Sequence, residues 1–483
     1  MGPTRHAALP RSAAAVQVKI VVVGAGMGGL TAALRLQRLG HQVVVLEARA
    51  EPGGLASSFD VGGFQFDAGP YILLDRAGLE WALGEVGIPA AERPTLIRLD
   101  HVYRVGFPDG TELDFHHDLA ATAEGFERRW KGAGVSYTRF VRETQRIHGR
   151  LQPLLTRPHS LAALVRTGAW RNAGFLLRSL GAVLARSGLP QPLIDALAIW
   201  THVAGQDLAH APSPLGLVPG LIHGVGAWYP EAGIGAIPRL VAAAALAAGV
   251  ELRTGTRVRA ILEQRGRSAG VETDAGECIP ADAVLSNYSA IGTQIEMVAS
   301  TPPAARAALT RLPLQSPGSC LYLALKGAAS PPYLRFFLPG GGERCRLLVQ
   351  PGVVVPRLVR GEEHPARLIA PMDHARSKEA GAEGQARFVA RLLDEPWWRD
   401  GIESVRVLAA RTPRDWGSEH HLYDDSMNPV MTARLMRAGR LPHRSRHQRG
   451  LYFAGSSTHP GQWVSFAAIS GVLAADRLHQ DLA

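Results

Sequence analysis

The sequence predicts an α/β protein in which a parallel-sheet domain carries an inserted α+β domain with a helical lid. Three observations lead to this fold class. A strand-helix-strand pattern lies near the start of the chain, and buried strands with glycine turns return to it near 281–287 and 450–461. The chain also has 483 residues, more than the roughly 250 to 300 that one hydrophobic core holds, so at least two domains are expected.

The strand-helix-strand pattern opens the first domain. An apolar, mostly β-branched run over 18–23 is typical of a strand buried on both faces. A glycine-rich turn over 24–29 follows, and apolar residues then recur at helical spacing over 30–39. A second buried strand is predicted over 43–46. This order predicts a Rossmann-type unit.

The glycines of the turn have the spacing G-x-G-x-x-G. Gly24 permits a tight turn, Gly26 lets the backbone approach a pyrophosphate, and Gly29 lets the helix pack closely on the strand. The pyrophosphate then meets free N–H groups at the helix N-terminus. Glu47, at the end of the second strand, can accept hydrogen bonds from both ribose hydroxyls and disfavours the 2′-phosphate of NADP. The unit therefore predicts a dinucleotide site.

Later segments complete a longer pattern. Gly53-Gly54 follows the ribose acid and lets the chain pass close to the phosphates and ribityl chain of a flavin. The others are GFQFDAGP at 63–70, WYPEAGIGAIP at 228–238, strands expected at 250–258 and 281–287, and GLYFAGSSTHPG at 450–461. With 21–30 and 47–49, these segments resemble the FAD-dependent amine oxidase and phytoene desaturase superfamily, and within it the bacterial carotenoid desaturases. The resemblance implies a Rossmann-type FAD-binding domain with an inserted substrate domain.

The resemblance also implies which residues bind FAD. They are Gly24, Ala25, Gly26, Met27, Gly28, Gly29, Glu47, Ala48, Arg49, Gly53, Gly54, Leu55, Val258, Gly455, Ser456, Gly461 and Val464. The backbone of Val258 is expected to contact adenine, and Gly455 to bring backbone N–H groups to the pyrophosphate. A closing helix from about Val464 is expected to point its N-terminus at the flavin pyrimidine ring, where it stabilises the reduced, anionic form.

Some residues depart from the family pattern. Leu55 stands where many relatives carry an arginine, and Tyr71 stands where a small hydroxyl residue is common. The segment 462–466 (QWVSF) replaces a glycine-rich stretch, so we expect Trp463 and Phe466 to reshape the pocket beside the flavin. These departures leave the identity of the substrate open.

The resemblance and the composition divide the chain into alternating segments. We expect a disordered tail at 1–17, the FAD-binding domain at 18–75, 226–290 and 446–483, and the substrate domain with its helical basic lid at 76–225 and 291–445. Cys278, Cys320 and Cys345 lie far apart and in no metal-binding spacing, and the pairs His116-His117 and His420-His421 lack a third ligand, so no metal is expected.

Part of the net charge of +10 comes from the predicted lid, because no acidic residue occurs between Thr144 and Ile194. This segment carries Arg146, Arg150, Arg157, Arg166, Arg171, Arg178 and Arg186 among leucines and aromatic residues. A helix or helix pair of this composition fits either an interfacial element on an anionic membrane or a cap with its arginines in water. Both interpretations make it the lid of a substrate channel. We expect a cytoplasmic, peripherally membrane-associated protein with no nucleic-acid partner.

The resemblance favours an enzyme that introduces C=C bonds into a lipophilic carotenoid or other polyisoprenoid, with hydride passing to flavin N5 and electrons then to quinone or oxygen. Asp67, Glu231 and His459 lie in family-like motifs and are candidate catalytic groups, although structural roles suit them as well. A flavin-dependent carotenoid isomerase or saturase, an amine oxidase-type enzyme and a non-catalytic flavin-binding membrane protein are the alternatives. The particular polyene, the catalytic base and the oligomeric state stay open.

Overall fold

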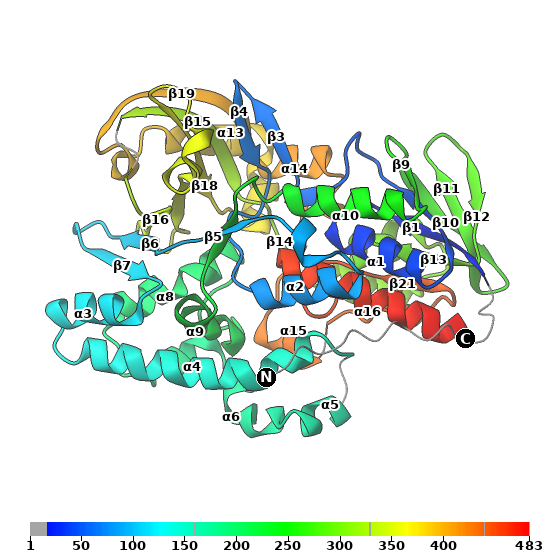
Figure 1. Ribbon diagram of the computed structural model, residues 1–483, viewed down its shortest axis with the longest axis horizontal. Helices are drawn as coiled ribbons and strands as arrows, with labels where there is room; N and C mark the ends of the chain where they lie inside the picture. Colours follow the sequence, from blue (N-terminus) through cyan, green and yellow to red (C-terminus); the bar gives the residue numbers. More distant parts are fainter. Residues whose placement is uncertain (1–16, 159–160, 328–329, 439, 483) are drawn as a thin grey trace.

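The computed structural model describes residues 17–158, 161–327, 330–438 and 440–482 (Figure 1). Apart from Gln17, the tail predicted over 1–17 lies outside the described residues. In Figure 1 a parallel sheet with its helices occupies the right-hand side, a larger sheet the upper left, and a layer of helices the lower left.

The parallel sheet has five strands in the order β21-β13-β1-β2-β9. They are β1 (Lys19–Val23), β2 (Gln42–Leu46), β9 (Glu251–Arg253), β13 (Ala283–Ser286) and β21 (Leu451–Phe453). Val21 pairs with Val44 on one side and with Val284 on the other, and all three side chains are at most 1% exposed. Continuous β-branched runs suit a sheet that is buried on both faces. Strands from distant parts of the chain thus build one sheet.

Helices cover the parallel sheet. The first, α1 (Met27–Arg38), packs against α10 (Ala236–Ala247) and α16 (Val464–Leu482), and α16 also packs against α2 (Arg76–Glu85). Helix α1 begins at Met27, directly after Gly26, so the start predicted at residue 30 is wrong. The cause is that the later glycines of the turn adopt helical geometry and form the first turn of α1.

The single strand predicted over 250–258 is also wrong. Strand β9 ends at Arg253, and a turn at Gly255, where φ is +64°, redirects the chain. Gly255 N–H and Thr256 N–H then donate to the carbonyls of Arg49 and Glu47 at 2.9 and 2.8 Å. The strands that follow form an antiparallel sheet of β10 (Val258–Gln264), β11 (Arg267–Thr273) and β12 (Cys278–Pro280).

The inserted domain is built on a mostly antiparallel sheet in the order β19-β15-β18-β17-β16-β6-β7. Its strands are β6 (His101–Gly106), β7 (Glu112–His116), β15 (Ser319–Gly327), β16 (Leu334–Phe337), β17 (Arg346–Val349), β18 (Glu363–Ala370) and β19 (Ile402–Arg411). Helix α13 (His374–Leu392) packs on β15 and β18, and α14 (Pro413–Glu419) packs on β19. Two-stranded pairs are β3 (Ser58–Val61) with β4 (Phe64–Asp67), β5 (Leu96–Arg98) with β8 (Trp228–Pro230), and β14 (Leu314–Gln315) with β20 (Asn428–Pro429).

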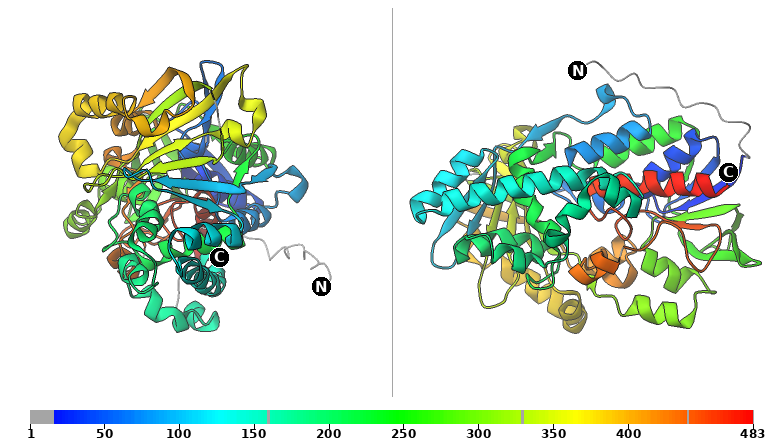
Figure 2. Two further views of the ribbon diagram at one scale, coloured as in Figure 1. Left: turned by 90° about the vertical axis from the view of Figure 1, so that its left-hand side faces the viewer. Right: turned by 90° about the horizontal axis from the view of Figure 1, so that it is seen from below.

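A helical layer lies below the inserted sheet in Figure 1. It comprises α3 (Leu119–Arg129), α4 (Ala133–Leu155), α5 (Leu161–Arg166), η3 (Ala169–Asn172), α6 (Ala173–Leu176), α7 (Leu180–Leu184), α8 (Gln191–Val203), η4 (Ser213–Leu217) and α9 (Val218–Gly224). The basic segment is therefore a series of short helices after α4, and the predicted helix or helix pair is wrong. Gly168 and Gly188, with φ of +69° and +71°, interrupt it. Figures 1 and 2 show α5 and α6 along the lower edge of the molecule.

The remaining short helices are α11 (Ala290–Gly292), α12 (Pro303–Thr310) and α15 (Ala433–Ala438). None of the helices in the described ranges is both long enough and apolar enough to cross a membrane.

Candidate functional site

A continuous cavity lies where the carboxyl ends of β1, β2 and β13 face the inserted domain. Val23, Leu46 and Asn287, at or just after the ends of these strands, line it. In open α/β sheets this edge is where ligands bind. The residues predicted to bind FAD that line the cavity are Gly24, Gly26, Met27, Gly28, Glu47, Ala48, Arg49, Gly53, Gly54, Leu55, Val258, Gly455, Ser456 and Val464.

The glycine turn leaves the start of α1 open to the cavity. Gly24 has φ of +89°, and a Cβ at Gly26 would lie 2.6 Å from Nδ2 of Asn287, so larger side chains do not fit there. The first turn of α1 contains no acidic residue, and its N-cap, Gly26, provides no side-chain acceptor. The free N–H groups and positive end of the helix therefore suit a pyrophosphate.

Glu47 lies beside the same turn. Its side chain is buried at 7% exposure, and its carboxylate accepts hydrogen bonds from Ala25 N–H at 2.6 Å and from Arg49 N–H at 2.9 Å. Each carboxylate oxygen has a second lone pair, so these bonds leave room for ribose hydroxyls. Gly53 N–H donates to the Ala25 carbonyl at 2.8 Å and holds the second glycine turn against the first. The donor and acceptor set fits the ADP part of FAD.

Three predicted FAD-binding residues do not line the cavity. Ala25 lies behind the turn, and a Cβ at Gly29 would lie 2.1 Å from the Gly24 carbonyl oxygen, so Gly29 serves close packing. Gly461 lies against Arg440 and Phe466. Contact of these three residues with the cofactor stays a prediction.

Gly455 lies where three segments of the chain meet, and its predicted approach to the pyrophosphate stays a prediction. Its N–H donates to Oγ of Ser470 on α16 at 2.9 Å, so this group is already engaged inside the protein. A Cβ at Gly28 would lie 2.8 Å from Gly455 N, and a Cβ at Gly455 would lie 2.7 Å from Oδ1 of Asn287. Gly455 therefore brings the C-terminal loop, the first glycine turn and Asn287 into contact.

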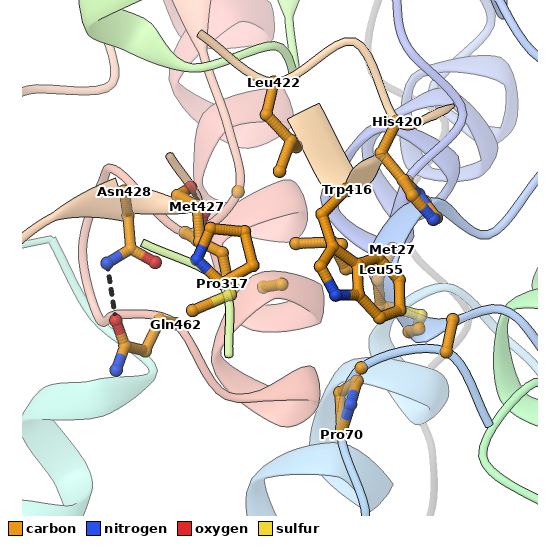
Figure 3. A pocket seen from close by; sticks show the side chains of 18 of the residues that line it. Met27, Leu55, Pro70, Pro317, Trp416, His420, Leu422, Met427, Asn428 and Gln462 are labelled. Carbon is orange, nitrogen blue, oxygen red and sulfur yellow. Dashed lines mark hydrogen bonds between the residues drawn. The ribbon is translucent and has the colours of Figure 1, made fainter. Parts of the chain in front are cut away.

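The other part of the cavity is formed by the inserted domain and is largely apolar. Trp200 and Val203 come from α8, Leu215 from η4 and Val218 from α9. Figure 3 shows other apolar side chains of the lining: Pro317, Trp416, Leu422 and Met427 from the inserted domain lie near Met27, Leu55 and Pro70 of the FAD-binding domain. A cavity of this lining favours a lipophilic ligand next to the nucleotide site.

Two basic side chains lie in the wall of the apolar part. Burial lowers the pKa of His420 to about 3, with further lowering by Arg49, Arg411 and His421, so its ring is neutral at physiological pH. Arg367 is 4% exposed and donates to the carbonyls of Ala68 and Gly69 at 2.8 and 3.0 Å. Its guanidinium stays charged, and its Nε and Nη1 have no hydrogen-bond partner among the described residues.

Carboxylates line only the nucleotide end of the cavity, within the described residues. They are Glu47 and Glu296, and Glu296 accepts a hydrogen bond from the hydroxyl of Tyr288 at 2.7 Å. Tyr288 directly follows Asn287 at the end of the parallel sheet. The apolar part thus combines a buried positive charge with no carboxylate.

The three catalytic candidates do not line the cavity. Asp67 is 6% exposed and accepts hydrogen bonds from Ser58, Tyr229 and Ile234 at 2.7 to 2.8 Å, so it closes the junction between β4 and the turn before α10. Glu231 is exposed and pairs with Arg357. Both carboxylates thus have partners within the protein and lie outside the cavity lining, and a catalytic role for either stays a prediction.

His459 links two parts of the molecule. Its Nε2 donates to the carbonyl of Leu154, near the end of α4, at 3.0 Å. Because a carbonyl can only accept, Nε2 carries a proton in this arrangement. His459 therefore attaches the helical layer to the C-terminal loop, and a role as base stays a prediction.

The basic segment lies one layer outside the cavity, since no described residue between Thr144 and Ile194 lines it. Helix α4 packs on α9 and η4, and α6 and α7 pack on η4. The segment covers the helices that form the wall, so the prediction of a direct lid needs this correction. Trp463 does line the cavity and stacks on Phe466 with ring centroids 4.7 Å apart.

Sequence reasoning missed several cavity residues. The most important are Asn287, Arg367, Trp416, His420, Gln315, Asn428 and Gln462 as polar or aromatic groups of the wall. Asn287 gave a signal, since it ends a buried strand at the sheet edge where ligands bind, and Gln462 lies in the segment 462–466 that departs from the family pattern. The others come from separate elements of the inserted domain and have no local motif.

Comparisons with known proteins agree with this geometry. The family of flavin containing amine oxidoreductases matches residues 27–328. The chain is 29% identical to a zeta-carotene-forming phytoene desaturase of Myxococcus xanthus, over 95% of this chain and 93% of that one. It is also 29% identical to a phytoene dehydrogenase of Streptomyces griseus, over 95% and 94% of the two chains.

Solved structures share the fold. An oxidoreductase from Methanosarcina mazei has a TM-score of 0.64 at 18% identity and covers 94% of this chain and 98% of its own. Putrescine oxidase bound to putrescine also has a TM-score of 0.64, at 15% identity, over 96% and 99% of the two chains. The family match covers more than half of the chain, and the glycine turns and the open start of α1 agree with it. The chain therefore belongs to the flavin containing amine oxidoreductase family and is an FAD-dependent oxidoreductase.

Proposed function

We propose that the protein is a carotenoid-type desaturase that introduces C=C bonds into a lipophilic polyene. The observation that carries the proposal is the continuity of the cavity: the glycine turns and Glu47 line one end, and Trp200, Leu215 and Trp416 line the apolar other end. FAD supplies the hydride acceptor. The protein's own residues hold the polyene in the apolar part, align its C–H bonds and exclude water. Relatives named as phytoene desaturases support this substrate class.

Electrostatics favours a polyene over an amine. An amine substrate is cationic in water, and its binding would be helped by a carboxylate and opposed by a buried positive charge. The lining of the apolar part includes the charged Arg367 and no carboxylate, since Glu47 and Glu296 lie at the nucleotide end and Asp67, which interacts with Arg367, lies outside the lining. An uncharged polyene meets no such repulsion.

The protein's surface supports access from a membrane. Val165, Trp170 and Leu177 are 66%, 57% and 63% exposed, and together with the exposed Arg166, Arg171 and Arg178 they form what we call the docking face. None of these arginines forms an ion pair within the described part of the chain. Apolar side chains can enter the headgroup region while each arginine near an anionic surface contributes about 1 kcal/mol. In this proposal η4, on which α6 packs and which lines the cavity with Leu215, lies between the docking face and the cavity.

The experiment that tests the function uses purified holoenzyme and polyenes in liposomes. Phytoene and its partly desaturated products are offered, and product mass is measured together with the flavin absorbance under anaerobic conditions. Desaturation removes two hydrogens per event and bleaches the flavin. An unchanged mass would instead identify an isomerase, a gain of two hydrogens a saturase, and bleaching by amines alone an amine oxidase.

A further inference from the structure

An amide cluster interrupts the apolar wall of the cavity. Gln315 ends β14, Asn428 begins β20, and Gln462 lies in the loop before α16. All three line the cavity, and Gln315 and Asn428 are each 4% exposed. Figure 3 shows Asn428 and Gln462 bonded to each other beside Pro317 and Met427, across the view from Trp416 and His420. Polar groups at such a position need partners, because burial without hydrogen bonds is unfavourable.

The hydrogen bonds within the cluster use only part of its capacity. Asn428 Nδ2 donates to Oε1 of Gln462 at 2.7 Å and to Oε1 of Gln315 at 2.9 Å, and it also lies 3.2 Å from the Pro429 carbonyl oxygen, so this nitrogen is fully engaged. Gln315 Nε2 donates to the carbonyl of Val203 at 3.0 Å. Asn428 Oδ1 and Gln462 Nε2 have no hydrogen-bond partner among the described residues, and neither belongs to the atoms that are closed off from solvent. One acceptor and one donor thus remain on two side chains that are bonded to each other.

The arrangement of Gln462 goes beyond what the fold requires. Gln315 and Asn428 are direct partners in the pairing of β14 with β20, so their mutual bond supports that pair. Gln462 comes from a separate loop and takes no part in the pairing. Its Oε1 occupies Asn428 Nδ2 and so fixes the amide with Oδ1 directed away from the bond. Such fixed polar groups in an apolar site are typical of groups that orient a ligand.

We propose that this amide cluster is a subsite for a hydroxyl group on the polyene, so that the substrate is an oxygenated polyene and not a pure hydrocarbon. A hydroxyl carries one donor and accepting lone pairs, so it can donate to Asn428 Oδ1 or accept from Gln462 Nε2. A hydrocarbon chain in the same place would displace water from both atoms and return no hydrogen bond. The inference rests on the proposed desaturase function and names its substrate class.

The test compares two polyenes that share a carbon skeleton and differ by one hydroxyl, offered to the holoenzyme in liposomes. The rate of anaerobic flavin bleaching gives kcat/KM for each. We expect the native protein to favour the hydroxylated polyene by roughly tenfold or more. Asn428→Leu and Gln462→Met should each bring the ratio close to one by lowering kcat/KM for the hydroxylated polyene alone, with FAD content unchanged.

A matched control is Gln206→Met. Gln206 is a buried glutamine, 5% exposed, whose Nε2 donates to the carbonyl of Met431, and it does not line the cavity. Its replacement should leave the ratio as in the native protein.

Every other outcome contradicts the hydroxyl subsite, and one outcome also contradicts the desaturase function. If the native protein uses both polyenes equally well, or if the ratio survives both substitutions, the subsite is wrong while the desaturase function stands. If both substitutions release FAD, the cluster is structural and the subsite is again wrong. If neither polyene bleaches the flavin, the proposed function fails and the subsite fails with it.

Discussion

The contact of three loops at Gly28 gives the sharpest test of the nucleotide site. In Gly28→Ala the new Cβ would lie 2.6 Å from Oδ1 of Asn287, 2.8 Å from Gly455 N and 2.9 Å from Gly455 Cα. Two of these atoms belong to the backbone and cannot rotate away, so the C-terminal loop has to shift. Overpacking of this kind costs about 1 to 3 kcal/mol. Since about 1.4 kcal/mol corresponds to tenfold in affinity, the Kd for FAD should rise roughly tenfold to a hundredfold.

The assay is titration of the apoprotein with FAD, together with chemical unfolding of the FAD-loaded protein. Gly149→Ala is the matched control, because Gly149 is also helical and a Cβ there meets nothing within 4 Å. Alanine there should leave FAD affinity unchanged and stabilise α4 by up to about 1 kcal/mol. If Gly28→Ala bound FAD as tightly as the native protein and were equally stable, the reasoning about this contact would be refuted.

Three further predictions concern acid sensitivity, a buried ion pair and the docking face. Burial lowers the pKa of His223 to about 4, so the unfolded state binds more protons than the folded state between pH 6.5 and 4. The free energy of unfolding should therefore fall as the pH drops through that window. His223→Gln should reduce this fall, which is measured as the free energy of unfolding against pH. Arg346→Met should cost about 1.5 to 3 kcal/mol in urea unfolding, because it removes the charge-assisted hydrogen bond to Glu395, which is 25% exposed and keeps its bond from Trp397. Arg357→Met, at an exposed pair, should cost less than about 1 kcal/mol. The double variant Trp170→Ser with Leu177→Ser should lower the affinity for anionic vesicles, measured by sedimentation, at least roughly tenfold. The control, Leu246→Ser with Val407→Ser at exposed sites elsewhere, should leave this affinity unchanged. Equal binding of both double variants would exclude the docking face.

Sequence patterns carried enough information for the parallel sheet. The β-branched run before Gly24 and the glycine spacing depend on local contacts, and residues in one short segment decide them. The predicted boundaries were less accurate. Helix α1 already starts at Met27, because Gly28 and Gly29 are helical at positions where no larger side chain fits, although glycine usually disfavours helices. The strand expected to reach Val258 ends at Arg253, because the turn at Gly255 bonds to the backbone beyond β2.

The apolar half of the site could not be predicted in the same way. Arg367, Trp416 and Asn428 lie on separate elements of the inserted domain, and only their packing brings them to one cavity. Asp67 shows the opposite case, since a carboxylate inside a family-like motif proved to be fully engaged by Ser58 and Tyr229. Motifs identify backbone geometry well, but they do not show which side chains have hydrogen-bonding capacity left for a ligand.

The central claim is that one cavity holds FAD and a polyene together. Anaerobic mixing of the holoenzyme with a polyene in liposomes, followed by counting reduced flavin and new C=C bonds, tests it most directly. We predict one flavin reduced for each double bond formed, and strong slowing when Val218→Trp fills the apolar end without loss of FAD. New double bonds without flavin reduction, or an unchanged rate in Val218→Trp, would contradict the account.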